Sequence, residues 1–151
     1  MFGKLPQGMG KLINLRHFFF FFFWYFNYSG LDLEFPRGFG RLISLKTISH
    51  ILVSGKDDTK GCKLRELKKL NHLQGTLQIK GLGNMVDACE AKNAQLKKKI
   101  GLRTLSLRFI EWDCQDTRRE NDVLVLNALE PPSCLEDLRI EWYNGTAMFP
   151  D

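Results

Sequence analysis

The chain has 151 residues, of which 44% are hydrophobic and 26% are charged, and its formal net charge is +5. These fractions are typical of a folded soluble domain, and they exclude a collagen, a disulfide-dense toxin and a long polar linker. The charge is uneven, because residues 1–100 hold 17 Lys and Arg against 7 Asp and Glu, whereas residues 101–151 hold 5 against 10.

The chain begins with two copies of one motif, which start at Leu5 and Phe35. Residues 5–16 and 35–46 share a proline, two glycines, a basic residue and a Leu-Ile-x-Leu run, all in step. Similarity at a fixed offset is the signature of a repeat architecture. The proline and glycines favour turns or short 3-10 pieces over full helices in these first two units.

Nine consecutive aromatic residues, Phe18 to Phe26, lie between the two copies. A membrane-spanning helix needs about 20 apolar residues, so this run is too short to span a bilayer. Basic residues precede it, as in a signal peptide, but that basic region is long and Tyr28-Ser29-Gly30 is a poor cleavage site. We interpret Phe18 and Phe20 as inward-facing strand residues and expect Phe21 to Phe26 to form a partly exposed patch that favours association.

Downstream, the leucine spacing of the motif persists. Equivalent positions recur at nearly regular intervals, namely at Phe18, Ile48, Leu77, Leu105 and Leu138. In L-x-x-L-x-L the last two leucines share one face of a short strand. One unit cannot bury that face alone, so stacked units align their strands into a parallel sheet. The pattern predicts an α/β leucine-rich-repeat solenoid with short parallel strands on the concave face, and with turns or 3-10 pieces and then helices on the convex face.

We predict a single domain over residues 1–151, with about five repeats and incomplete at both ends. Its strands are expected near 15–20, 45–50, 77–80, 104–109 and 136–142. Helices are expected over Asp87–Lys99, where Asp87 and Glu90 resemble a capping box, and over Glu120–Glu130, before two prolines. The polar stretches Ser54–Gly61 and Asp113–Asp122 are expected to be surface loops.

Strand residues that alternate with the leucines must face solvent on the concave side. We take six of them as candidate contact residues for a protein partner: Lys80, Thr104, Arg108, Asp137, Arg139 and Glu141.

Other site chemistries have weaker signals. Gly81-Leu82-Gly83 follows an expected strand and precedes an expected helix, as in a dinucleotide site, but Val86 occupies the third glycine position.

The four cysteines and three histidines are dispersed, so no metal site is predicted, and disulfides would need an oxidising compartment. No catalytic motif is present, so neither enzymatic activity nor a cofactor is expected. Lys97 to Lys99 suit the C-terminal end of a helix, and nucleic-acid binding is not predicted.

These motifs resemble the leucine-rich-repeat region of plant intracellular nucleotide-binding disease-resistance proteins, especially those with a coiled-coil N-terminus. The resemblance rests on residues 5–17, 64–75, 79–84 with the following Glu90-Ala91-Lys92, and 129–138. It implies a cytoplasmic immune-receptor module that binds a pathogen effector or host guardee and contacts the nucleotide-binding domain of a full-length receptor. The chain has no G-x-x-x-x-G-K-[ST] phosphate loop, so that switch is absent from it. A truncated or degenerate receptor product without signalling function is the alternative.

Overall fold

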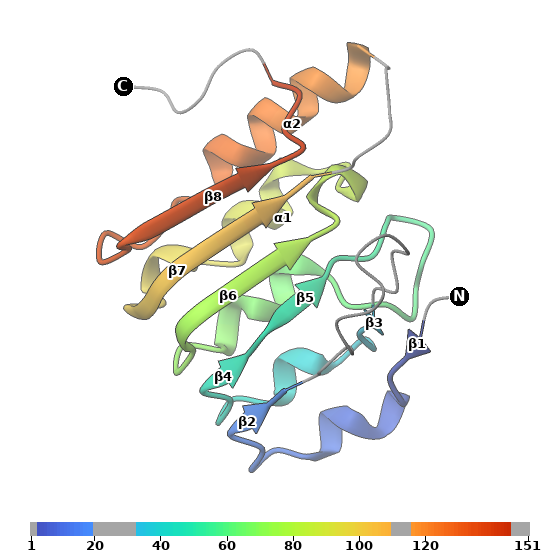
Figure 1. Ribbon diagram of the computed structural model, residues 1–151. Helices are drawn as coiled ribbons and strands as arrows, with labels where there is room; N and C mark the ends of the chain where they lie inside the picture. Colours follow the sequence, from blue (N-terminus) through green and yellow to red (C-terminus); the bar gives the residue numbers. More distant parts are fainter. Residues whose placement is uncertain (1–2, 20–32, 110–115, 146–151) are drawn as a thin grey trace, which may run out of the picture.

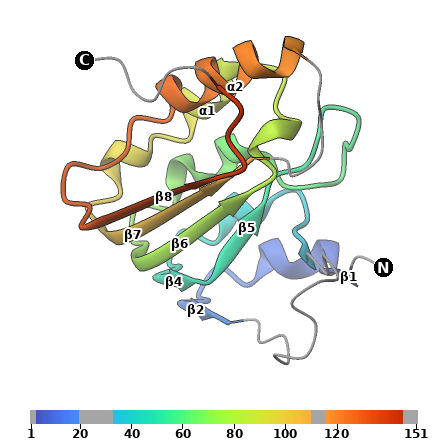
Figure 2. The ribbon, with the colours of Figure 1, turned by 45° about the horizontal axis from the view of Figure 1, so that its top comes forward.

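The computed structural model describes residues 3–19, 33–109 and 116–145. In two views, strands β2 and β4 to β8 lie in one layer, with β5 continuing from the end of β4, and the helices lie behind this layer (Figures 1 and 2). The order of the strands across the layer follows the order of the chain, as expected when each repeat stacks on the one before it.

All strand pairs named here are parallel. The four-stranded sheet has the order β5-β6-β7-β8, with β5 at His50–Leu52, β6 at Gln74–Lys80, β7 at Gly101–Arg108 and β8 at Asp137–Glu141. Two smaller pairs join the first two repeats: β1 (Gly3–Lys4) with β3 (Leu33–Glu34), and β2 (His17–Phe18) with β4 (Thr47–Ile48).

The segments that return between strands change character along the chain. Early repeats use the 3-10 helices η1 (Gln7–Lys11), η3 (Phe39–Arg41) and η4 (Leu64–Lys69), and later ones add η5 (Leu82–Asn84), α1 (Ala88–Asn93), η6 (Leu96–Lys98) and α2 (Asp116–Ala128).

Two helix expectations need correction. The helix expected over Asp87–Lys99 is divided into α1 and η6, because Gln95 takes the left-handed conformation with φ 52°. The loop expected over Asp113–Asp122 is wrong from Asp116 onward, where α2 begins, and residues 113–115 lie outside the described part. Polar residues are compatible with a solvent-facing helix, and Val125 and Leu126 supply its buried side.

Small irregularities keep the strands in register. Ser49 is exposed between β4 and β5, whereas Ile48, His50 and Ile51 are all buried. The sequence pattern makes Ile48 equivalent to Leu77, whereas in the sheet Ile51 pairs with Ile79. The first interval is one residue longer than the second, and the break at Ser49 accommodates the extra residue. A second shift occurs after Gly75, whose φ of 76° suits glycine.

One row of equivalent residues shows how closely the repeats correspond. The residue after each of four 3-10 segments has φ between −77° and −90° and ψ between 54° and 64°: Leu12, Leu42, Leu70 and Lys99. We call these four residues the Leu/Lys row, and each donates its amide to the carbonyl three residues earlier. Leu12 is 51% exposed, whereas Leu42, Leu70 and Lys99 are fully buried, and Lys99 places an amine where its neighbours place a leucine.

The repeated glycines have different functions. A Cβ at Gly10 would lie 2.8 Å from the Gly38 carbonyl oxygen, and one at Gly40 would lie 2.5 Å from that of Glu66. Backbones of adjacent repeats therefore touch where the motif has its second glycine. Gly38 adopts a φ of 88°, whereas a Cβ at Gly8 would meet no atom within 4 Å.

Phe35 is the centre of an aromatic cluster. Its ring makes edge contacts with Phe18, Phe39 and His50, at centroid distances of 6.2, 5.0 and 5.8 Å. Phe35 is 1% exposed, whereas Phe19 is 57% exposed and stacks against His17. The remaining aromatic residues of the run, including Phe20 and the expected patch at Phe21 to Phe26, lie outside the described residues.

Candidate functional site

The open face of the sheet, which points away from the helices, carries the six candidate contact residues. Leucines and isoleucines alternate with them and are buried on the other face, as at Leu105 and Leu107. The register of β7 and β8 places Thr104 opposite Asp137 and Arg108 opposite Glu141. Lys80 ends β6, so its side chain starts from the same end of the sheet as Arg108.

At the charged end of this face, a polar contact across two repeats joins Arg108 to Glu141. The Arg108 Nε donates to Glu141 Oε2 at 2.8 Å, and the Ser106 hydroxyl donates to Glu141 Oε1 at 3.3 Å. Both carboxylate oxygens are thus engaged, and the two charged side chains are 40% and 33% exposed. Ser106 is buried and is not among the six candidates. Because it lies two residues before Arg108 on the same strand, the alternation of the sequence already placed it on the same face.

Asp137 and Arg139 form a second pair within β8. Arg139 donates from Nε and Nη2 to Asp137 Oδ2 at 3.1 and 2.8 Å. Residues two apart on a strand point to the same face, so the spacing alone makes this contact possible. Exposed ion pairs contribute little to stability, and their main effect here is to fix the orientation of charges on an accessible surface.

A different chemistry lies at the other end of the open face. His17 shares a hydrogen bond of 2.8 Å between its Nδ1 and Thr47 Oγ1, across β2 and β4. The stacked Phe19 ring beside it is largely exposed. The face therefore runs from an aromatic end in the first repeats to a charged end in the last ones.

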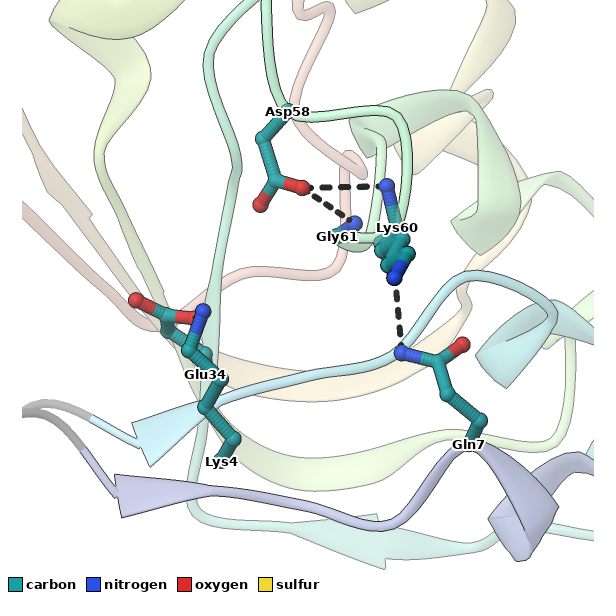
Figure 3. Close-up of polar contacts among 6 residues, drawn as sticks. All are labelled: Lys4, Gln7, Glu34, Asp58, Lys60 and Gly61. Atoms are coloured by element: carbon teal, nitrogen blue, oxygen red, sulfur yellow. Dashed lines mark hydrogen bonds and ion pairs between the residues drawn. The ribbon is translucent and has the colours of Figure 1, made fainter.

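The loop of residues 54–61 is hydrogen-bonded to the first repeat, close to an ion pair between β1 and β3 (Figure 3). Gln7 Nε2 donates to the Lys60 carbonyl at 3.3 Å, and Lys4 forms an ion pair of 2.8 Å with Glu34. Asp58 Oδ1 accepts the amides of Lys60 and Gly61, both at 3.0 Å. Partial burial would raise the pKa of Asp58, but hydrogen bonds from the Lys60 amide, the Ser54 hydroxyl and the Gly61 amide outweigh it and lower that pKa.

The glycines that resemble a dinucleotide motif have a packing explanation. A Cβ at Gly81 would lie 2.6 Å from the Val53 carbonyl oxygen of the preceding repeat, and its φ is 77°. Val86 is 66% exposed and does not pack between a helix and a strand. Stacking of the repeats therefore accounts for Gly81.

The thiols and histidines are dispersed in space as well as in sequence. Within residues 3–19, 33–109 and 116–145, no three metal-binding side chains gather in one place. Cys62, Cys89 and Cys134 are free thiols, and burial raises the pKa of Cys62 far above its ordinary value. Cys114 lies outside the described residues.

Parallel strands in chain order, repeated 3-10 ends and stacked leucine rows define a repeat protein of the leucine-rich class. The family of R13L1/DRL21 LRRs matches residues 64–151. The chain belongs to this family of leucine-rich-repeat regions.

Plant resistance proteins are among the relatives. The chain is 36% identical over 116 residues to putative disease resistance protein RGA1 of Solanum bulbocastanum, covering 77% of this chain and 11% of that protein. It is 37% identical over 113 residues to putative disease resistance protein At3g14460 of Arabidopsis thaliana, covering 71% and 8%. Disease resistance protein RGA2 of Solanum bulbocastanum is 36% identical over 106 residues, covering 70% and 10%.

The chain thus spans roughly a tenth of the length of these relatives. No solved structure matches it. Among the helices in the described part, none combines the length and apolar character needed to cross a membrane.

Proposed function

We propose that the chain is a non-enzymatic protein-recognition module of a plant disease-resistance receptor. In this proposal its repeats form one arc of a curved solenoid, and the open face of the sheet is the concave side. The partner is a pathogen effector or the host protein that an effector alters, and the module acts in the cytoplasm. In a full-length receptor the same repeats contact the nucleotide-binding domain and hold it inactive.

One observation carries the proposal most directly. Charged side chains on β7 and β8 are held in defined positions on an accessible face by contacts with one another, as in Arg108 with Glu141. Pre-oriented charges lose less conformational entropy on binding and favour a partner of complementary charge. The kinship with resistance proteins supports a protein as that partner.

A two-hybrid screen of the chain against a panel of pathogen effectors tests this function. Each interactor is retested with Thr104→Arg and Arg139→Glu, which alter the open face, and with Lys92→Glu, an exposed residue of α1. Loss of interaction with the first two variants, but not with the third, is expected. Interactors that tolerate both open-face changes would contradict the proposal.

A further inference from the structure

Basic residues recur at one position of four successive repeats. Lys11, Arg41, Lys69 and Lys98 each directly precede a residue of the Leu/Lys row, namely Leu12, Leu42, Leu70 or Lys99. All four are exposed, and among the described residues none of them forms an ion pair. We call these four residues the basic row.

A second row lies two residues farther along the chain. Ile13, Ile43 and Ile100 each directly follow a residue of the Leu/Lys row, and they are 54%, 51% and 74% exposed. Asn71 holds the same position in the third repeat, between Ile43 and Ile100. These four residues form the isoleucine row, and the two rows together form the double row. The row thus presents three exposed isoleucines, interrupted by one polar residue, without a covering element in the described part.

The repeats stack closely enough to keep the rows aligned. Gly10 packs against the backbone of Gly38, and Gly40 against that of Glu66, so successive 3-10 segments are in contact. Lys99 reaches back to Asn71, which joins the third repeat to the fourth. Neighbouring strands lie about 4.8 Å apart, and because the rows lie only a few residues before the strands, we expect them to step from repeat to repeat by about this distance or slightly more.

An α-helix matches this spacing. Its residues three or four apart are separated by about 4.5 to 6 Å along the axis and lie on one face. Carboxylates at such positions can meet the basic row one by one, while apolar residues on the adjacent stripe cover the isoleucine row. Nucleic acid offers phosphates but no apolar stripe, and the double row lacks the aromatic anchors common at membrane interfaces.

We propose that the double row binds an acidic amphipathic helix of a partner protein, lying across the repeats. This surface is separate from the open face, and the inference does not depend on the proposed function.

The test uses a labelled 18-residue helical peptide with Glu at alternating spacings of three and four residues and Leu on the adjacent stripe. Fluorescence anisotropy measures its binding to the full chain. A peptide with Lys in place of Glu, vesicles containing phosphatidylserine, and duplex DNA are the comparison probes. We expect the acidic peptide to bind more tightly than the Lys peptide, the vesicles and the DNA, with an affinity that falls as salt rises.

Variants locate the binding. One variant combines Lys11→Glu, Arg41→Glu, Lys69→Glu and Lys98→Glu. It should bind the acidic peptide with an affinity about tenfold or more lower. The control set Arg37→Glu, Lys56→Glu, Lys60→Glu and Lys92→Glu makes the same charge change at exposed sites outside the double row and should weaken it by less than about threefold. Ile13→Ser with Ile43→Ser and Ile100→Ser should reduce affinity without changing the salt dependence.

Equal losses in the two charge sets would show attraction by net charge alone and would overturn the proposal. Stronger binding of vesicles or DNA than of the acidic peptide would overturn it in favour of those partners. Circular dichroism confirms that each variant is folded, and Lys98→Gln with Arg41→Gln repeats the test with a milder change.

Discussion

Lys99 Nζ donates a hydrogen bond of 3.2 Å to Asn71 Oδ1 from a fully buried position. The equivalent positions in the two preceding repeats hold Leu42 and Leu70, both fully buried. A lysine has thus replaced a core leucine, and Asn71 of the preceding repeat supplies an oxygen for its amine. Burying an amine with so few partners costs free energy.

Burial, with a smaller contribution from Lys98, lowers the pKa of Lys99 from 10.5 to about 8. Between these values Lys99 binds more protons in the unfolded chain than in the folded one, so it makes the free energy of unfolding rise with pH. We expect this Lys99 contribution to be a gain of about 2–3 kcal/mol from pH 8 to 10.5 and to be lost in Lys99→Leu. The buried Cys62 thiol acts in the opposite direction above pH 9.0, because its pKa is raised, so the contribution is the difference between the unaltered chain and Lys99→Leu. Denaturant titrations at several pH values measure this gain.

The substitution Lys99→Leu should also raise stability at pH 7, because it removes the buried charge. Lys68→Leu, at an exposed site, is the matched control and should retain the pH-dependent gain. If Lys99→Leu keeps the gain as well, another group causes it and the burial of Lys99 is not its origin.

The two kinds of glycine in the repeated motif should respond differently to alanine. Gly40→Ala places a methyl group against the Glu66 backbone and should cost about 1–3 kcal/mol, as overpacking does. Gly8→Ala meets open space and should change stability little. Urea unfolding of both variants makes the comparison, and equal effects would show that the second and third repeats do not stack as described.

The aromatic residues of the first two repeats should divide into residues that stabilise the core and residues that do not. Phe35→Ala empties the centre of the cluster and should cost about 3–5 kcal/mol in the free energy of unfolding. Phe19→Ala removes an exposed ring and should cost less than about 0.5 kcal/mol. Thermal unfolding measures both, and a large loss with Phe19→Ala would mean that this ring is buried.

Arg108 and Glu141 should have a small but measurable coupling free energy. A double-mutant cycle with alanine is expected to give about 0.5–1 kcal/mol at low salt, because both side chains are partly exposed. Arg103 and Glu136, 3.5 Å apart and more exposed, should give almost none. A larger coupling for the second pair would contradict the assigned geometry.

Much of the repeat pattern could be read from the sequence because leucine spacing reflects burial directly. On β6, Leu77 and Ile79 are fully buried whereas Gln78 and Lys80 are partly exposed, as a two-residue period requires. The break at Ser49 and the left-handed Gln95 were not predicted, since both depend on how one repeat is fitted to the next. Lys99 was interpreted as a charge at a helix end, because nothing local shows that it replaces a leucine.

The candidate contact residues were chosen by alternation alone. That argument assigns a face, but it cannot show that Glu141 is held by both Arg108 and Ser106, because those partners belong to another repeat. The double row was equally hard to see, since its members are a full repeat apart in the sequence and become neighbours only when the repeats stack.

The affinity of an interacting effector for the purified chain, measured by isothermal titration calorimetry, tests the central claim that the open face of the sheet recognises protein. The proposed function predicts that Arg108→Glu with Arg139→Glu weakens binding about tenfold or more. Arg37→Glu with Lys92→Glu, at exposed sites that carry none of the candidate contact residues, should leave it nearly unchanged. Unaltered affinity in the first variant would contradict the assignment of the open face as the recognition surface.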